Sequence, residues 1–322
     1  MRAIVYRQGQ SAAGFVVEEV EKPHAAAGQV LVAVRAAGVN VLDWYLRRGL
    51  RFGSGRGAAP RVGRDLAGVV EAVGTGVTRV KPGDEVLGLG RGAFAEYVVA
   101  NENLVAAKPA NISFQQAAGV GVAGLTALQG LRDAGRLRTG EHVLVNGASG
   151  GIGTFMVQIA KAFGAEVTAV CSTRNVDMVR SIGADHVIDY QRTDFTSGSR
   201  RYDLIVDIVA TGAWLRRASM LTPTGRYVFV GGPPMRGVGM FFVSLFAGRR
   251  LNAFITRPRA ADLDVLVELM RRGEVMPVVD REYAFGDAGD AVAYVAEGHT
   301  RGKVVLIVRG ADDERTSDTN TR

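Results

Sequence analysis

The stretch NGASGGIG, from Asn146 to Gly153, places four glycines in eight residues between two different apolar patterns. The short apolar run Val143–Val145 before it is typical of a buried strand. After it, apolar residues recur at helical spacing: Ile152, Phe155, Met156, Ile159, Ala160 and Phe163. The stretch therefore connects a strand to the N-terminus of a helix, where free backbone N–H groups and the helix dipole favour a phosphate.

This glycine loop suits a dinucleotide. Gly150 and Gly151 let the backbone approach a pyrophosphate, and Gly153 lets the helix pack tightly on the strand. We predict that Ser149, Gly150, Gly151 and Ile152 bind the cofactor. The spacing also fits the G-x-x-x-G-x-G motif of short-chain dehydrogenases. In this chain, however, over a hundred residues precede the loop, and no later tyrosine is followed four positions on by a lysine, so we reject that family.

Two kinds of organisation follow each other along the chain. Up to about Pro109, short β-rich runs alternate with glycine and proline turns, which predicts a small β-barrel. Beyond it, strand and helix patterns alternate, which predicts a parallel sheet that a helix at Leu263–Val275 closes. The last strands are expected to complete the β domain. The predicted division is a catalytic β domain over 1–114 and 274–310, a cofactor-binding domain over 115–273 and a disordered, mostly polar tail over 311–322.

Composition limits the class of protein. Hydrophobic residues make up 47% and charged residues 22% of the 322 residues, which indicates a globular protein. No apolar run is long enough to span a membrane, and we expect a cytoplasmic protein. The single cysteine, Cys171, and four scattered histidines argue against a bound metal. The net charge of +7 comes mainly from arginines that form no stripe, so a nucleic acid partner is not expected.

Six segments resemble those of one enzyme superfamily and occur in its order along nearly the whole chain. They are Ala36–Gly49, Gly63–Val86, Gly119–Leu128, Asn146–Ala165, Ser181–Tyr190 and Gly302–Val308. The sequence is similar to the medium-chain dehydrogenase/reductase superfamily, in its zinc-free quinone oxidoreductase (zeta-crystallin-like) branch. The resemblance implies an α/β fold, with a GroES-like β-barrel domain plus a Rossmann domain with a doubly wound parallel sheet. It also implies a homodimer.

The end of the second strand of the parallel sheet bears on the choice of cofactor. An NAD enzyme is expected to place an acid there to hold the ribose, but this chain has Ser172, Thr173 and Arg174. A guanidinium and two hydroxyls suit a 2′-phosphate, so we predict NADPH. The alternative is that Arg174 is a surface residue that caps a short helix.

The resemblance implies further cofactor contacts. Thr126 would reach the phosphates, Gly231 and Gly232 would pass under the nicotinamide ribose, and Phe254 would line the nicotinamide site. Tyr190 resembles a family tyrosine beside the adenosine, although it could equally pack the end of a strand.

The expected reacting end lacks the zinc ligands of related alcohol dehydrogenases. Asn40 stands where those enzymes have a cysteine, and Gly63-Arg64-Asp65 where they have Gly-His-Glu. Without a Lewis acid to stabilise an alkoxide, the oxidation of an alcohol loses its main electrostatic aid. An electron-poor quinone or enone can still accept a hydride, because the charge spreads into a conjugated carbonyl that hydrogen-bond donors can stabilise. The candidate catalytic residues are Asn40, Asp43 and Tyr45, each of which could instead be a hydrogen-bonded loop residue. Apolar walls of a pocket between the domains could come from Trp44, Phe52 and residues 241–246.

The sequence thus predicts an NADPH-dependent, zinc-independent reductase of quinones or α,β-unsaturated carbonyls. An enoyl-thioester reductase is one alternative, with Arg47, Arg48 and Arg51 as a basic rim for substrate phosphates. A non-catalytic NADPH-binding protein that binds nucleic acid or senses redox state is the other.

Overall fold

The computed structural model describes residues 1–7, 14–45, 61–209, 214–230 and 251–308. It divides into two compact units. The first, the β unit, comprises the described residues of Met1–Val122, Pro258–Arg271 and Pro277–Arg322, and the second, the Rossmann unit, comprises those of Ala123–Arg257 and Arg272–Met276. We describe each unit by itself. None of the described helices is long and apolar enough to cross a membrane.

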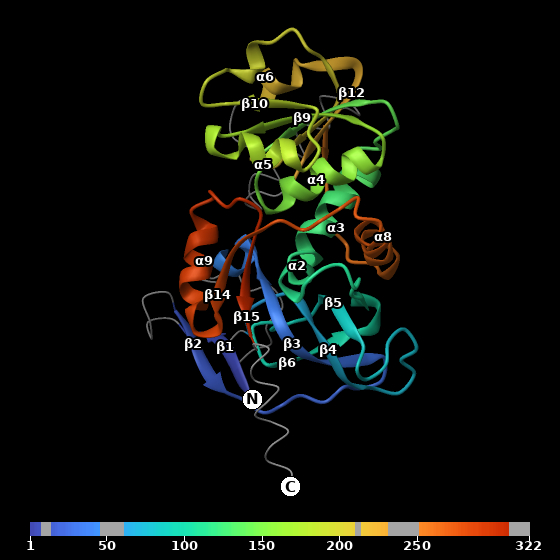
Figure 1. The fold of residues 1–322 in the computed structure, drawn as a ribbon, viewed down its shortest axis with the longest axis vertical. Helices are drawn as coiled ribbons and strands as arrows, with labels where there is room; N and C mark the ends of the chain where they lie inside the picture. The colour runs from blue at the N-terminus through green and yellow to red at the C-terminus, as the bar shows by residue number, and fades with distance from the viewer. Residues whose placement is uncertain (8–13, 46–60, 210–213, 231–250, 309–322) are drawn as a thin grey trace. The chain divides into compact units, whose positions relative to one another are not determined.

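The described part of the β unit contains a seven-stranded sheet and a β-hairpin (Figure 1). The sheet strands are β3 (Gln29–Val39), β4 (Asp65–Val73), β5 (Glu85–Leu89), β6 (Tyr97–Asn101), β7 (Val105–Ala107), β14 (Val279–Ala284) and β15 (Lys303–Ile307). Their order is β14-β15-β3-β4-β5-β7, with β6 paired to β3. The hairpin joins β1 (Arg2–Tyr6) and β2 (Phe15–Glu19). The predicted GroES-like β domain is thus present, and its sheet includes the last strand, β15, which pairs with β3.

Apolar side chains from these strands form the core of the β unit. In β3, Val30, Val32 and Val34 are fully buried, and Leu306 of β15 joins the same cluster. The helices and short 3₁₀ turns of the unit are α1 (Val41–Tyr45), η2 (Glu102–Leu104), α2 (Phe114–Ala118), α8 (Ala260–Arg271), η7 (Phe285–Asp287) and α9 (Ala288–Ala296). Ser113 caps α2, since it accepts a bond from the backbone of Gln116 and the Gln116 side chain bonds back.

The Rossmann unit contains a parallel sheet whose six described strands have the order β10-β9-β8-β11-β12-β13. The strands are β8 (His142–Asn146), β9 (Glu166–Cys171), β10 (His186–Asp189), β11 (Tyr202–Asp207), β12 (Leu221–Phe229) and β13 (Leu251–Ala253). The helical segments are α3 (Gly121–Gln129), which starts in the β unit, η3 (Gly130–Ala134), α4 (Gly151–Ala162), η4 (Thr173–Asn175), α5 (Val176–Ser181), η5 (Phe195–Ser197) and α6 (Trp214–Ala218). The predicted doubly wound parallel sheet is confirmed.

The helix at α8 differs from the prediction. Its position before the last strands suggested that it closes the parallel sheet, but α8 belongs to the β unit and packs on β7. Two polar contacts hold it there: Asp264 pairs with Arg79 at 2.7 Å, and the backbone oxygen of Met270 accepts a bond from the Asn111 side chain. The amphipathic pattern identified a helix but carried no information about which sheet its apolar face would cover. The predicted tail lies outside the described residues.

Candidate functional site

The glycine loop follows β8, at the point where the order of the parallel sheet changes direction. From β8, the chain adds β9 and β10 on one side and then β11, β12 and β13 on the other. In an open parallel sheet, ligands bind at the carboxyl ends of the strands at this switch point. The loop therefore lies where the fold places a dinucleotide.

The backbone of the loop fits a pyrophosphate. Gly147 has a φ of 89°, which favours glycine, and a Cβ on Gly153 would lie 2.1 Å from the Gly147 oxygen. Among the described residues, a Cβ on Gly150 would meet only the backbone oxygen of Gly147, at 3.6 Å, so these residues leave the space beside Gly150 open. Gly150 caps α4 without a side-chain bond, which leaves N–H groups of the first turn available to a phosphate.

A buried polar network lies directly under the loop. Asp207, which is fully buried at the end of β11, accepts bonds from Asn146 Nδ2 at 2.7 Å and the Tyr227 hydroxyl at 2.5 Å. Arg217 Nε lies 3.1 Å from the same carboxylate. Burial and the neighbouring carboxylate raise the pKa of Tyr227, so its hydroxyl remains a donor. The network ties β8 to β11 at the switch point. The sequence reasoning did not use its signal, which is that an amide, Asn146, and an acid, Asp207, each end an apolar strand.

The structure brings most of the predicted adenosine-end residues together. Ser172 begins η4 directly after β9, and the backbone N–H of Tyr190 donates to the oxygen of Cys171 at 3.1 Å. Thr173 donates its hydroxyl hydrogen to Asp189 at 2.5 Å, so that hydrogen is engaged within the protein. Arg174 is exposed, and Tyr190 is 51% exposed.

Asp189 and Asn175 were not predicted from the sequence. Asp189 ends the third strand, β10, rather than the second, and only the pairing of β10 with β9 places it beside Thr173. Asn175 is buried, and its Nδ2 donates to Ser149 Oγ at 2.9 Å and to Ser172 Oγ at 3.1 Å. It therefore connects the glycine loop to the end of β9.

Thr126, expected at the cofactor phosphates, and Phe254, expected at the nicotinamide, also lie in one region of the Rossmann unit. The hydroxyls of Thr126 and Thr256 are 2.9 Å apart, and Gln129 bonds to the backbone of Arg257. A Cβ on Gly130 would lie 3.2 Å from the ring of Phe254, so the segment after β13 packs closely against α3 and η3. Gly231 and Gly232 lie outside the described residues.

Asn40 belongs to a buried network in the β unit whose central cation is Lys303. Lys303 Nζ donates to Asn40 Oδ1 at 2.7 Å and lies 3.4 Å from Asp65, which is fully buried. Asn40 Nδ2 donates to Asp65 at 3.1 Å and to the Gly38 oxygen at 3.4 Å. The bond to Gly38 is long, so it is the bond that Asn40 would exchange most easily for a ligand oxygen. Lys303 was missed because it lies far from Asn40 in sequence, at the start of the last strand.

Asp43 holds the segment after β3 in place. Its carboxylate accepts bonds from the backbone N–H of Asn40 at 2.8 Å and of Gly63 at 3.3 Å. Burial, and to a lesser degree the charge of Asp65, raises the pKa of Asp43 to about 7. With these two bonds, Asp43 can orient the backbone at Asn40 and Gly63.

The remaining expected site residues are only partly described. Tyr45 is half-buried at the end of α1, and Trp44 packs on the core of the β unit. Phe52, residues 241–246 and the arginines considered for a basic rim lie outside the described residues. Within the described part of the chain, no group of three or more His, Cys, Asp or Glu side chains could hold a metal ion.

The chain matches two family models, an alcohol dehydrogenase GroES-like domain over residues 26–110 and a zinc-binding dehydrogenase over residues 182–306. It is 33% identical to a chloroplastic quinone-oxidoreductase, QR1, of Triphysaria versicolor, over 95% of this chain and 98% of that protein. It is 35% identical to a 2-methylene-furan-3-one reductase of Solanum lycopersicum, over 86% of this chain and 71% of the relative. The structure of Escherichia coli quinone oxidoreductase complexed with NADPH superimposes with a TM-score of 0.80 and 25% identity, over 95% of this chain and 100% of the other.

Proposed function

The chain belongs to the quinone oxidoreductase branch of the medium-chain dehydrogenase/reductase superfamily and is an NAD(P)H-dependent oxidoreductase, and on that premise we propose that it reduces quinones or α,β-unsaturated carbonyls with NADPH. The observation that carries the proposal is the open glycine turn at the switch point of the parallel sheet, combined with Asn40 and Asp65 in place of zinc ligands.

Bound NADPH would supply the hydride, and the residues of this chain would bind and orient the reactants. The N–H groups at the start of α4 would bind the pyrophosphate, and the hydrogen bond from Asn146 to Asp207 holds the loop against β11. Thr126 would reach the phosphates, and Phe254 would line the nicotinamide site. A preformed site of this kind loses little entropy when the cofactor binds.

The reacting end needs groups that stabilise charge spreading into a conjugated carbonyl. Asn40 would donate its Nδ2–H to that oxygen in exchange for its long bond to Gly38, while Lys303 and Asp65 keep the amide plane fixed. Tyr45 would donate a hydrogen bond or the balancing proton, and Asp43 would hold the backbone between them.

A preference for NADPH rests on Ser172 and Arg174. Both follow β9, where an NAD enzyme would place an acid. The carboxylate of Asp189 is nearby but is already bonded to Thr173 and lies 3.4 Å from Arg192. Its charge is therefore partly balanced within the protein, and Arg174 remains the group that suits a 2′-phosphate.

The test is oxidation of NADPH, with NADH in parallel, against naphthoquinones, an alkenal, a cyclic enone and crotonyl-CoA. We expect turnover of a quinone or an enone, with kcat/KM at least about 10-fold higher for NADPH than for NADH. Turnover of the thioester alone would identify an enoyl-thioester reductase. Tight NADPH binding with every acceptor inert would instead favour a non-catalytic sensor, whose nucleic acid binding would weaken with salt.

We further propose that the enzyme acts in the cytoplasm as a homodimer. Light scattering coupled to size-exclusion chromatography should give twice the mass of one 34.2 kDa chain. A monomer at micromolar concentration would contradict the proposed dimer, and fractionation of the source cells would test the location.

A further inference from the structure

Asn175 has an unusual set of bonds for a buried asparagine. Its Nδ2 donates to Ser149 Oγ at 2.9 Å and to Ser172 Oγ at 3.1 Å. Its backbone N–H donates to the backbone carbonyl oxygen of Ser172 at 2.9 Å. Its Oδ1 is buried and has no hydrogen-bond partner; among the described residues it is the one such side-chain atom. A buried oxygen without a partner costs about 1–3 kcal/mol, so this arrangement requires an explanation.

The direction of the two serine bonds provides one. Since Asn175 donates to both serines, each hydroxyl accepts within the protein and keeps its own hydrogen for another partner. If the amide were turned over, Oδ1 would accept both hydroxyl hydrogens and the serines would have none left to donate. An Asn amide can adopt either orientation, so its surroundings decide which is used.

The positions of the two serines indicate what they donate to. Ser149 lies in the glycine loop, one residue before the cap of α4, and Ser172 directly follows β9 as the N-cap of η4. Both serines are half-buried, whereas Asn175, which holds them, is buried. Phosphate oxygens accept hydrogen bonds and donate none when ionised, which matches two hydroxyls with free hydrogens.

We propose that Asn175 is a positioning residue that sets the hydroxyls of Ser149 and Ser172 as hydrogen-bond donors to the phosphates of the dinucleotide. Ser149 serves the pyrophosphate, and Ser172 serves the phosphate on the adenosine ribose. One buried amide thereby couples recognition of the two phosphate groups. This inference rests on the proposed use of NADPH and adds a residue that selects for phosphate at both positions.

The main competing explanation is that Asn175 only fastens the glycine loop to η4. A residue with that purely structural role would stabilise the folded protein, and its replacement would lower the Tm and the cofactor affinity together. A positioning residue with an unsatisfied oxygen affects affinity more than stability. The variant Asn175→Asp separates the two, because a carboxylate keeps the shape of the side chain but can only accept bonds, which draws both serine hydrogens inward.

The test is calorimetric binding of NADP⁺, 2′,5′-ADP and ADP-ribose to wild type, Asn175→Ala and Asn175→Asp, with thermal unfolding of each apo protein. Ser172 would contact 2′,5′-ADP, and Ser149 would contact the pyrophosphate of ADP-ribose. We expect Asn175→Ala to weaken all three ligands by about 5-fold and Asn175→Asp by about 100-fold, measured at a temperature well below the Tm of each variant so that every apo protein is fully folded. Asn111→Ala, which removes an asparagine bond in the β unit, is the matched control and should change none of the affinities.

A triple variant tests whether Asn175 acts through the two serines. Adding Asn175→Ala to a protein that already carries Ser149→Ala and Ser172→Ala should weaken NADP⁺ no further than the two serine changes do, whereas independent effects would multiply and overturn the proposal. Unchanged affinities in Asn175→Asp, or losses that follow a lowered Tm, would also overturn it and leave the proposed function intact. If wild type bound none of the three ligands, both the proposed cofactor and this role of Asn175 would be wrong.

Discussion

Lys303 shows how much a single residue contributes to the proposed reacting end. It is the cation nearest to the fully buried carboxylate of Asp65, and it also accounts for the bond at Asn40 Oδ1. Removing one partner of a buried ion pair leaves the other charge in an environment that solvates it poorly.

We therefore expect Lys303→Met to lower the free energy of unfolding by about 3–5 kcal/mol in chemical denaturation. Lys22→Met is the control, because Lys22 pairs with Glu71 at the surface and should contribute no more than about 1 kcal/mol. A loss in Lys303→Met as small as in the control would show that water or a rearranged side chain compensates Asp65.

Asp43 should make stability depend on pH. Its pKa is raised from 3.8 to about 7 mainly by burial, so between these values the folded protein keeps a proton that the unfolded chain has lost. Stability from this group is therefore fully present below about pH 4 and falls as pH rises toward 7. Asp43→Asn cannot titrate, so the free energy of unfolding of wild type minus that of the variant should fall between pH 4.5 and 7.5. A constant difference would contradict the raised pKa.

The glycine loop that follows β8 contains two glycines, Gly153 and Gly150, whose missing side chains matter for different reasons. A Cβ on Gly153 would meet backbone at 2.1 Å, whereas a Cβ on Gly150 would meet its nearest neighbour at an ordinary 3.6 Å. The first glycine is required by packing and the second by the approach of a ligand.

Gly153→Ala should therefore lower the Tm by several degrees, while Gly150→Ala should keep the Tm and weaken NADPH binding by about 10-fold or more. Gly286→Ala, where no atom of the described residues lies within 4 Å of the added Cβ, is the control for an alanine in an open position. Cofactor affinity unchanged in Gly150→Ala would mean that the backbone of this loop does not approach the pyrophosphate.

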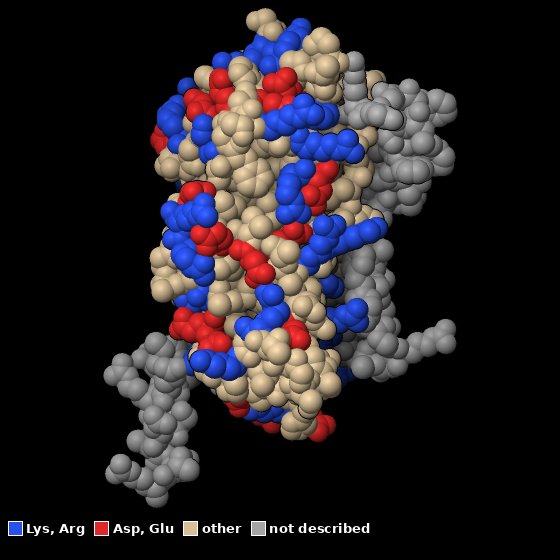
Figure 2. All heavy atoms as spheres, turned by 90° about the vertical axis from the view of Figure 1, so that its right-hand side faces the viewer, with Lys and Arg blue, Asp and Glu red and all other residues tan. Residues whose placement is uncertain are grey.

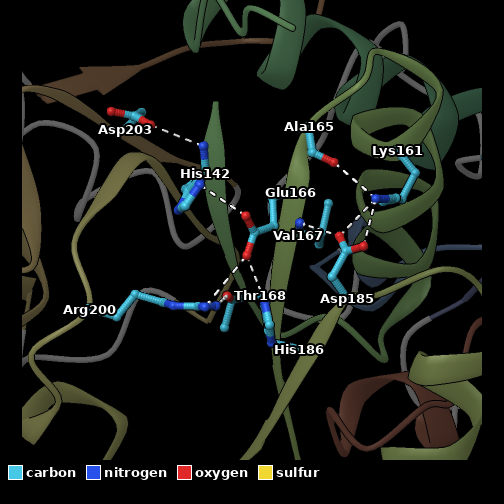
Figure 3. A network of polar contacts seen from close by, with 10 residues as sticks. All are labelled: His142, Lys161, Ala165, Glu166, Val167, Thr168, Asp185, His186, Arg200 and Asp203. Atoms are coloured by element: carbon cyan, nitrogen blue, oxygen red, sulfur yellow. Dashed lines mark hydrogen bonds and ion pairs between the residues drawn. The ribbon is translucent and has the colours of Figure 1, made fainter. Parts of the chain in front are cut away.

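At the amino-terminal ends of β8, β9 and β10, several side chains contact one carboxylate, that of Glu166. His142 begins β8, Glu166 begins β9 and His186 begins β10, and both imidazoles point at the Glu166 carboxylate, with Nε2–O distances of 2.9 and 2.7 Å (Figure 3). Arg200 approaches the same carboxylate at 3.5 Å. The hydrogen bond from His186, followed by the charges of His142 and Arg200, holds the pKa of Glu166 below its usual value.

A lowered carboxylate pKa stabilises the folded state above the unfolded pKa, and the stabilisation is lost as pH falls through the folded pKa. Glu166→Gln should therefore lower the Tm slightly at pH 6, by the equivalent of no more than about 1 kcal/mol for this half-exposed cluster. The difference from wild type should vanish near pH 3. A difference that persists at pH 3 would assign the effect to packing rather than charge.

At the scale of the whole molecule, charge and metal content distinguish the proposed reductase from its alternatives. On the face drawn in Figure 2, Lys and Arg side chains are interspersed with Asp and Glu and do not form a field of one sign. Mixed charge of this kind gives nucleic acid no continuous phosphate track on that face.

The zinc-binding dehydrogenase model that matches residues 182–306 makes metal content worth measuring directly. We expect elemental analysis of the purified protein to find far less than one zinc per chain, and turnover to be unchanged after prolonged treatment with EDTA. Stoichiometric zinc, or activity that EDTA removes and zinc restores, would contradict the predicted zinc-independent chemistry.

The sequence by itself determined the class of fold and the location of the glycine loop. The change from β-rich runs to alternating strands and helices, and the glycines between Val145 and Ile152, are local patterns that depend only on neighbours in the chain. A β-barrel and a parallel sheet follow from these patterns, while the resemblance of several segments identified the superfamily and implied the GroES-like and Rossmann folds.

Only the tertiary structure decided which distant side chains meet. Lys303 reaches Asn40 because β15 pairs with β3, Asp189 reaches Thr173 because β10 pairs with β9, and α8 belongs to the β unit because its apolar face packs on β7. Burial likewise raises the pKa of Asp43 and leaves Asn175 Oδ1 without a partner. Pairing register and burial depend on contacts between residues far apart in sequence, which no local pattern encodes.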